Sequence, residues 1–365
     1  MQDVAILDSS EQIHEQHPEG DCQLFFGGPD RPQRFLRDLL EKRIHGVPSG
    51  GEILWITYYF RDEGLAKALL QACRRGVKVR VVMEGSPRTE TANRRVEELL
   101  SSEDALGKNL RVLSHSRLDK RFKSSRLHEK LYYFSHPVPR AMVGTFNPSG
   151  NLPEDPDIIR EIGDQDRGHN VLVELLDQTL VRGLYAHARH IFRKTHGPWE
   201  RFLPQSNKVI SSGKIQALFF PRLRRTLFYK LFSDLGTDSR LRMAVSHLND
   251  PDICKRLIGL VRQGVHVEVL THDTERRVPS WVEEEMLSKG VIFNRYVHPE
   301  ELPMHNKFML IDTPDRQLVV FGSMNLSIRS LNVNHELLVI AEDSTLYHAF
   351  RQRWDEMLCE LRSWS

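Results

Sequence analysis

The residues of this sequence best suited to chemistry lie close together between residues 304 and 340. His305 and Lys307 are two positions apart in a segment with the apolar pattern of a buried strand, so their side chains share one face. A second apolar segment follows a turn and ends in a Gly-Ser-Met-Asn sequence. An imidazole, an ammonium, a hydroxyl and an amide on one face can bind a tetrahedral anion. The candidate site residues of this span are His305, Lys307, Asp312, Ser323, Asn325 and Glu336.

A second copy of this pattern occurs in the first half of the chain. It has the same His-x-Lys pair, followed by a Gly-Thr-Phe-Asn sequence. Ser135 stands where the pattern predicts an aspartate, and Asn170 stands where it predicts the closing glutamate. The first copy has therefore lost two carboxylates and kept its imidazole and its ammonium group. Its candidate site residues are His128, Lys130, Thr145 and Asn147.

An internal repeat surrounds both copies. Residues 53–60 and 77–82 read as strands on either side of a helix, and residues 241–248 and 265–270 repeat this order. In both copies a glycine follows the helix and the next strand begins at once, as in a right-handed βαβ crossover, which predicts a largely parallel sheet. The predicted fold class is α/β, with two similar halves related by a pseudo-twofold and mainly parallel or mixed sheets flanked by helices. The expected domains are an N-terminal extension at residues 1–20, a first half at 21–200 and a second half at 201–365.

The His-x-Lys-x4-Asp and Gly-Ser-x-Asn sequences, closed by Asn334-His335-Glu336, resemble the phospholipase D superfamily. The second copy is most similar to bacterial cardiolipin synthases. This resemblance implies one shared pocket with His128 and His305 on opposite sides. One imidazole would attack a phosphodiester to give a phosphohistidine, and the other would protonate the leaving oxygen. It also implies that the lysines and asparagines of both motifs hold the phosphate oxygens, that the two hydroxyls (Thr145, Ser323) contact substrate, and that no cofactor or metal is needed.

The resemblance therefore implies an enzyme, a phospholipase D-type phosphodiesterase or phosphatidyltransferase that acts on an anionic glycerophospholipid. Two alternatives stay open: a nuclease or other phosphodiesterase of the same superfamily, and a catalytically silent lipid- or nucleotide-binding scaffold, which Ser135 and Asn170 suggest. The roles of the histidines also stay open. We expect Glu336 to support His305, which favours His305 as the nucleophile, whereas the superfamily more often uses the histidine of the first motif.

Composition narrows the expected setting of the protein. A net charge of +2 over 365 residues argues against a dedicated nucleic-acid binder, although a local basic patch could still bind nucleic acid. Four cysteines without paired spacing are typical of a reducing compartment. No apolar segment approaches the about 18 residues that cross a bilayer. We expect a cytoplasmic protein that meets lipid peripherally at the inner membrane surface, and the sequence predicts no oligomeric state.

Three charged segments accompany the motifs. A basic segment at residues 117–126 precedes the first motif, and an acidic insertion at residues 154–166 follows it. Both join motif strands, so we expect them near the mouth of the site. A basic and apolar helix predicted at residues 222–235 could lie on an anionic membrane, although its counterpart in the first half favours a role in the fold. The candidate substrate-binding residues of the basic segment are Arg121, Lys123 and Arg126.

Overall fold

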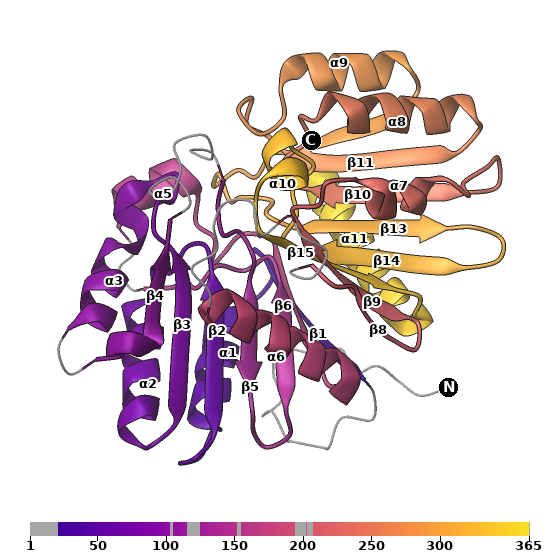
Figure 1. The fold of residues 1–365 in the computed structure, drawn as a ribbon. Coiled ribbons are helices and arrows are strands. Elements are labelled where there is room, and N and C mark those ends of the chain that lie inside the picture. Colours follow the sequence, from indigo (N-terminus) through magenta and orange to yellow (C-terminus); the bar gives the residue numbers. More distant parts are fainter. Residues whose placement is uncertain are drawn as a thin grey trace.

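Two mixed β-sheets, each with helices on both faces, form the framework of the protein (Figure 1). The structure is a computed structural model, and it describes residues 21–102, 105–114, 125–151, 155–193, 202 and 207–364. The first sheet has the strand order β1-β7-β6-β5-β2-β3-β4, and the second has the order β12-β11-β10-β13-β14-β15-β9-β8. The α/β class and the two similar halves predicted from the sequence are confirmed.

The first half supplies seven strands and their helices. The strands are β1 (Cys22–Gly27), β2 (Glu52–Thr57), β3 (Lys78–Glu84), β4 (Leu110–Leu113), β5 (Leu131–Phe134), β6 (Arg140–Gly144) and β7 (Asn170–Leu175). The helices are α1 (Phe35–His45), α2 (Glu63–Arg74), α3 (Arg94–Ser101), α5 (Pro156–Ile162) and α6 (Gln178–Arg193).

The second half follows with eight strands. They are β8 (Ile210–Ser212), β9 (Ile215–Phe220), β10 (Arg240–Val245), β11 (His266–His272), β12 (Ile292–Tyr296), β13 (Lys307–Asp312), β14 (Gln317–Gly322) and β15 (Glu336–Ala341). The helices are α7 (Thr226–Tyr229), α8 (Pro251–Arg262), α9 (Ser280–Ser288), α10 (Ile328–Asn332) and α11 (Ser344–Trp364).

Each sheet contains the predicted βαβ unit, β2-α2-β3 in one and β10-α8-β11 in the other, with parallel strands. Both helices begin at an aspartate, Asp62 or Asp250, whose carboxylate accepts backbone N–H groups of the first turn. Both are followed by a glycine in the left-handed region, Gly76 at φ 91° and Gly264 at φ 86°, which turns the chain into the next strand.

The expectation of largely parallel sheets is wrong for the rest of the fold. In the first sheet β5, β6, β7 and β1 pair antiparallel, and in the second β13, β14, β15, β9 and β8 do. For β13 and β14 the reason is the length of the connection. The turn between β13 and β14 has only four residues, too few for the crossover that a parallel pair requires.

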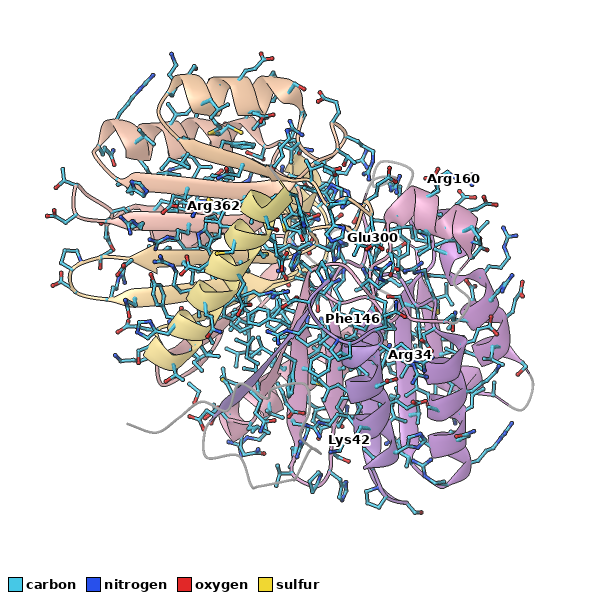
Figure 2. The ribbon with its side chains drawn as sticks, turned by 180° about the vertical axis from the view of Figure 1, so that it is seen from behind. Arg34, Lys42, Phe146, Arg160, Glu300 and Arg362 are labelled. Atoms are coloured by element: carbon cyan, nitrogen blue, oxygen red, sulfur yellow. The ribbon has the colours of Figure 1, made fainter. Side chains whose placement is uncertain are left out.

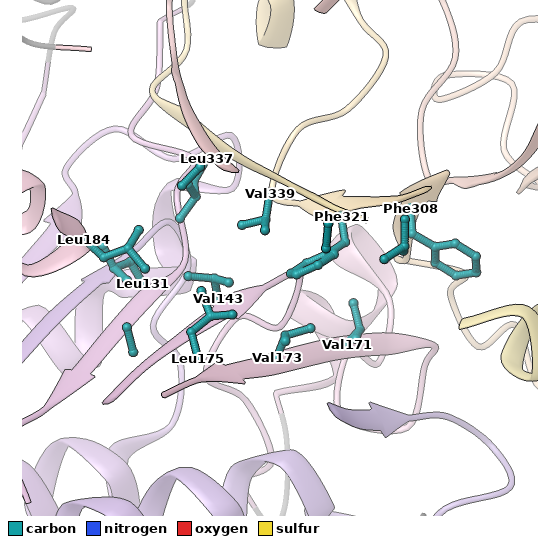
Figure 3. Packing of buried hydrophobic residues seen from close by; sticks show 14 of the residues in the cluster. Leu131, Val143, Val171, Val173, Leu175, Leu184, Phe308, Phe321, Leu337 and Val339 are labelled. Atoms are coloured by element: carbon teal, nitrogen blue, oxygen red, sulfur yellow. The ribbon is translucent and has the colours of Figure 1, made fainter. Parts of the chain in front are cut away.

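The two halves are joined by a common apolar core. The inner faces of both sheets, together with α6 and α11, form one cluster of buried side chains. Two further clusters lie on the outer faces, one under α1, α2 and α3 and one under α7, α8 and α9. Figure 3 shows the central layer, with side chains of the first sheet facing those of the second: Val143, Val171, Val173 and Leu175 on one side and Phe308, Phe321, Leu337 and Val339 on the other.

The predicted amphipathic helix at residues 222–235 is not formed. Only α7 and a single 3-10 turn at Lys230–Phe232 are helical there. Phe228, Leu231 and Leu235 are buried in the outer core of the second half, so this apolar face packs on its own sheet instead of facing a membrane. Across the described ranges, no helix combines the length and the apolar character needed to cross a membrane.

Candidate active site

Both His-x-Lys pairs lie at the start of a central strand, where the two halves meet. Residue 128 is held by the other half, since His128 N–H donates to His335 O at 2.9 Å and His335 N–H donates to Arg126 O at 2.8 Å. His305 is held in the same way, because its N–H donates to His169 O at 3.0 Å and His169 N–H donates to Pro303 O at 3.0 Å. These two short parallel bridges fix both imidazoles at the boundary between the sheets.

The buried imidazole of His128 is supported by the second half. Its Nδ1 lies 2.8 Å from Oε2 of Glu336, which is fully buried. Ser323 Oγ donates to the same oxygen at 2.5 Å, and Asn334 Nδ2 donates to Oε1 at 3.2 Å. The expectation that Glu336 supports His305 is therefore wrong. The carboxylate crosses the boundary because β15 starts beside the bridge that holds the first motif.

His305 is supported by an amide from the first half. Its Nδ1 lies 2.8 Å from Asn170 Oδ1. The orientation of this amide is fixed because Asn170 Nδ2 donates to Gln165 O at 2.7 Å. Oδ1 is therefore an acceptor, and the Nδ1 of His305 carries the hydrogen. Nε2 is left as the nitrogen that gains or loses a proton.

The two hydroxyls of the motifs have equivalent positions behind the histidines. Thr145 Oγ1 donates to Asn170 Oδ1 at 3.0 Å and accepts from Val171 N–H at 2.9 Å. Ser323 Oγ donates to Glu336 and accepts from Leu337 N–H at 3.1 Å. These bonds direct both hydroxyls at the groups behind the histidines, and the substrate contact expected from the sequence stays a prediction.

The lysines and asparagines keep donors that a phosphate could use. Each ammonium donates one hydrogen bond to the carbonyl of its own motif histidine. Lys130 donates to His128 O and Lys307 to His305 O, both at 2.7 Å. Asn147 Nδ2 donates to Gln165 Oε1 at 2.8 Å and has a second N–H. In the described part of the chain, the buried Oδ1 of Asn325 has no hydrogen-bond partner.

Burial dominates the electrostatics of this site. It lowers the pKa of His128 to about 4 and the pKa of Lys130 to about 7, against the opposing attraction of Glu336. Burial, then the charges of Lys307 and Lys130, hold the pKa of His305 well below its usual range. The pKa of Lys307 is also held well below normal, by burial first and then by Lys130 and Arg277. The site therefore disfavours additional positive charge and favours a bound anion.

Glu336 responds in the opposite direction. Burial alone would raise the pKa of its carboxyl, but attraction to His128 and Lys130 and the hydrogen bonds from His128 and Ser323 hold that pKa below normal. Glu336 is therefore ionised at neutral pH. An ionised partner keeps the Nδ1 of His128 protonated, which leaves Nε2 with a free lone pair.

Asp312 is not part of this constellation. It ends β13, whereas Lys307 begins that strand, so about 16 Å of extended chain separates them. Its carboxylate accepts instead from Gln317 Nε2 at 3.4 Å. The structure therefore places Asp312 away from the start of β13, and we infer a structural role for it. Ser135 has the equivalent place at the end of β5, where its hydroxyl accepts from Glu52 N–H at 2.7 Å.

The charged segments lie only partly within the described residues. Arg121 and Lys123 lie outside them, so their substrate contact stays a prediction. Arg126 is described, and its N–H donates to Asn334 Oδ1 at 3.1 Å next to the site. The part of the acidic insertion from Asp155 onward contains α5, which lies at the edge of the first half nearest the second (Figures 1 and 2).

Sequence reasoning missed two site residues. Gln165, at the end of the acidic insertion, contacts both Asn147 and Asn170. Tyr58 follows β2 and lies beside the first motif, with its ring centroid 5.1 Å from that of His128 and 5.4 Å from Lys130 Nζ. No fixed motif marks either one. The join between the insertion and the strand that carries Asn170 is the signal that could have found Gln165.

Comparisons with known proteins bear on the family of this chain. The family model described as "Cardiolipin synthase, PLD-like domain" matches residues 49–151 and 235–358. The mitochondrial cardiolipin hydrolase of Xenopus laevis is 25% identical over 124 residues, which are 34% of this chain and 56% of the relative. That of Danio rerio is 27% identical over 136 residues, 37% of this chain and 58% of the relative. The chain therefore spans little more than half the length of these curated relatives.

Two solved structures share the fold over most of this chain. Phosphatidylserine synthase from Haemophilus influenzae Rd KW20 has a TM-score of 0.66 at 12% identity and covers 93% of this chain and 86% of its own. Polyphosphate kinase from Porphyromonas gingivalis has a TM-score of 0.59 at 15% identity and covers 93% of this chain and 50% of its own. At these identities the likeness shows the fold alone. Because the family model matches both motif-bearing segments and more than half of the sequence, the chain belongs to the phospholipase D superfamily, in the family of cardiolipin synthase, PLD-like domains.

Proposed function

We propose that the protein cleaves or transfers a phosphodiester of an anionic glycerophospholipid through a phosphohistidine on His128. The observation that carries this proposal is the asymmetry behind the two imidazoles. His128 has the ionised carboxylate of Glu336 at Nδ1, whereas His305 has the neutral amide of Asn170. A carboxylate makes an imidazole more basic and more nucleophilic, so His128 is the better nucleophile and His305 the better acid.

In the first step, the Nε2 lone pair of His128 forms a P–N bond while the P–O bond to the leaving group breaks. His305 Nε2 gives its proton to the leaving alkoxide. In the second step, water or an alcohol gives a proton back to His305, its oxygen bonds to phosphorus and the P–N bond breaks. Water gives hydrolysis, and an alcohol gives transfer.

His305 must be protonated for the first step, although its pKa is held well below normal by burial and by nearby lysines. A bound phosphodiester anion offsets the charges of Lys307 and Lys130 and so raises the pKa of His305 when substrate is present. The same two ammonium groups stabilise the charge that develops on the phosphate oxygens in the transition state.

The choice of lipid rests on the family model and on the cardiolipin hydrolases, whose names state a lipid substrate. The small net charge supplies no specific argument for nucleic acid. Peripheral attachment to an anionic membrane is part of the proposal, and flotation with anionic and neutral vesicles across a salt series tests it.

The test of the activity is product analysis with labelled cardiolipin, phosphatidylglycerol and single-stranded DNA. The wild-type protein should release or transfer a lipid phosphoryl group, and His128→Ala and His305→Ala should each abolish turnover. Mass spectrometry of the quenched enzyme should find the phosphoryl group on the peptide that contains His128. Label on His305 would reverse the roles, cleavage of DNA alone would favour a nuclease, and no turnover of any substrate would favour the silent scaffold.

A further inference from the structure

Arg277 is a buried charge with few hydrogen-bond partners among the described residues. Its side chain is buried, with 5% of the residue exposed. One hydrogen bond is formed, from Nη2 to Ile162 O at 3.0 Å, while Nε and Nη1 are buried without a partner within the described part of the chain. A guanidinium has five N–H groups, and burying it without a carboxylate has a large energetic cost. Such a cost is expected where the charge serves a ligand.

Arg277 lies on the same sheet edge as the second motif. It follows β11, and its carbonyl accepts from Leu248 N–H at 3.2 Å in the loop after β10. β10 in turn pairs with β13, placing Val245 opposite Lys307. Burial is the largest cause of the lowered pKa values of His305 and Lys307, and the charge of Arg277 is a further cause of both. The guanidinium is therefore a near neighbour of the catalytic pair.

Two exposed arginines surround the buried one, one from each half of the molecule. Arg276 precedes it in the chain, and Arg88 of the first half donates to Glu161 O at 2.6 Å on α5. The charges of Arg276 and Arg88 both lower the pKa of Arg277, which burial, the largest cause, brings to about 9. Two carboxylates are close to the group: Asp273 is bound to His272, and Glu161 is 3.6 Å from Arg88. Neither forms an ion pair with Arg277.

We propose that Arg277, with Arg276 and Arg88 at its rim, binds a second phosphate group of the substrate whose first phosphate reacts at His128. This inference rests on the proposed function and deepens it, because it names the substrate class as a phosphodiester that carries a second phosphate. The oxygens of a phosphate can accept hydrogen bonds from the N–H groups at Nε and Nη1 of a planar guanidinium. A substrate with two phosphates joined through glycerol and one with a diphosphate linkage share this chemistry.

A different role for Arg277 would be to tether α5 through the Ile162 carbonyl. That role predicts an equal loss for every substrate when Arg277 is changed. Second-phosphate binding predicts an additional loss that is confined to substrates with two phosphates. The two roles are therefore separated by a ratio of rates and not by a single rate.

The experiment compares kcat/KM of the full chain on cardiolipin, a diphosphate-linked diacylglycerol nucleotide, and phosphatidylglycerol in mixed micelles. Arg277→Gln should lower the ratio of kcat/KM on at least one two-phosphate lipid to kcat/KM on phosphatidylglycerol by about 10- to 100-fold, the loss expected for a charged hydrogen bond. Which of the two lipids is affected identifies the linkage. Arg262→Gln, at the far end of α8 on the opposite sheet edge, is the control and should change no ratio. Equal losses on all three lipids would overturn the proposal.

A binding measurement on the wild-type protein covers the case in which Arg277→Gln does not fold. Calorimetry with glycerol 1,3-bisphosphate and with glycerol 3-phosphate should show at least about tenfold tighter binding of the bisphosphate. Equal affinities would contradict the second site even if turnover is normal. Absence of turnover with preferential binding of the bisphosphate would instead contradict the proposed function and leave the second site standing.

Discussion

At the scale of single residues, the proposed function depends on which group accepts the Nδ1 hydrogen bond of each imidazole. Glu336 supports His128 and Asn170 supports His305, each across the boundary between the halves. Glu336→Gln keeps the shape of the side chain but removes its charge, so the Nδ1 proton of His128 is no longer held by an anion. We expect kcat to fall by about 10²- to 10⁴-fold. Asp312→Asn makes the same chemical change at the other end of β13 and should keep kcat within about threefold. Similar losses in both variants in a steady-state assay would contradict this assignment.

Asn170→Asp tests the role of His305. A carboxylate at this position would stabilise the imidazolium and raise the pKa of His305. Because an acid with a higher pKa stays protonated up to a higher pH, the alkaline limb of the kcat profile should move to higher pH. Asn170→Ala, which lacks any acceptor, is the control and should not move the limb upward. An unchanged or downward-shifted limb in Asn170→Asp would show that His305 is not the acid.

The buried lysines make stability depend on pH. The pKa of Lys130 is lowered by burial to about 7, so between that value and its ordinary range the unfolded chain binds more protons than the folded one. The free energy of unfolding should therefore rise as pH rises from about 7 to about 10, with a slope of at most about 1.4 kcal/mol per pH unit for this group. Urea denaturation should show a smaller slope for Lys130→Met, whereas Lys78→Met, at an exposed position, should match wild type. An unchanged slope in Lys130→Met would refute the shift.

Residue spacing was enough to predict His128, Lys130, His305 and Lys307, because side chains two apart on a strand share a face whatever the rest of the fold does. The partner of each histidine could not be predicted in this way. Glu336 is 208 positions from His128, and their meeting depends on how two sheets pack. Asp312 shows the converse limit, since a residue of the motif can lie at the wrong end of its strand to reach the site.

At the scale of elements, the repeat predicted the βαβ units well because capping aspartates and left-handed glycines are local signals. The segment at residues 222–235 failed because its apolar spacing fits a helix, yet tertiary contacts bury Phe228, Leu231 and Leu235 from a short and irregular backbone. The acidic insertion was expected near the mouth, and α5 reaches the second half through the bond between Ile162 and Arg277.

α5 is attached by few apolar contacts, and this predicts local opening. Ile162 belongs to a small cluster with Tyr58, Tyr59 and Ala92, separate from the main cores. Ile162→Ala should therefore loosen α5 without unfolding the molecule. Hydrogen exchange followed by mass spectrometry should become faster in the peptide that covers α5 and stay unchanged in the peptide that covers β13. Faster exchange in both would show that α5 is an integral part of the core.

At the scale of the whole molecule, the site exists only where the halves meet. Each motif histidine is bound through both its backbone and its side chain by the other half, and the central core contains side chains of both sheets (Figure 3). Neither half can therefore present a complete histidine, lysine and support set alone. The apolar layer shared by the two sheets holds the two halves of the chain together in their pseudo-twofold arrangement.

This arrangement predicts the behaviour of a divided chain. Residues 1–200 and 201–365, expressed separately, would each expose the apolar face that the other covers, so each should be inactive and prone to aggregate. Co-expressed, they should associate and recover turnover, because burying that face drives association. Co-purification and a phosphodiesterase assay measure both effects, and His128→Ala in one fragment or His305→Ala in the other should abolish the recovered activity. Mixing the full-length His128→Ala and His305→Ala proteins should restore nothing, since every pocket would keep one defect. Activity of a single fragment, or recovery on mixing the full-length variants, would mean that the catalytic pair forms between chains instead of within one.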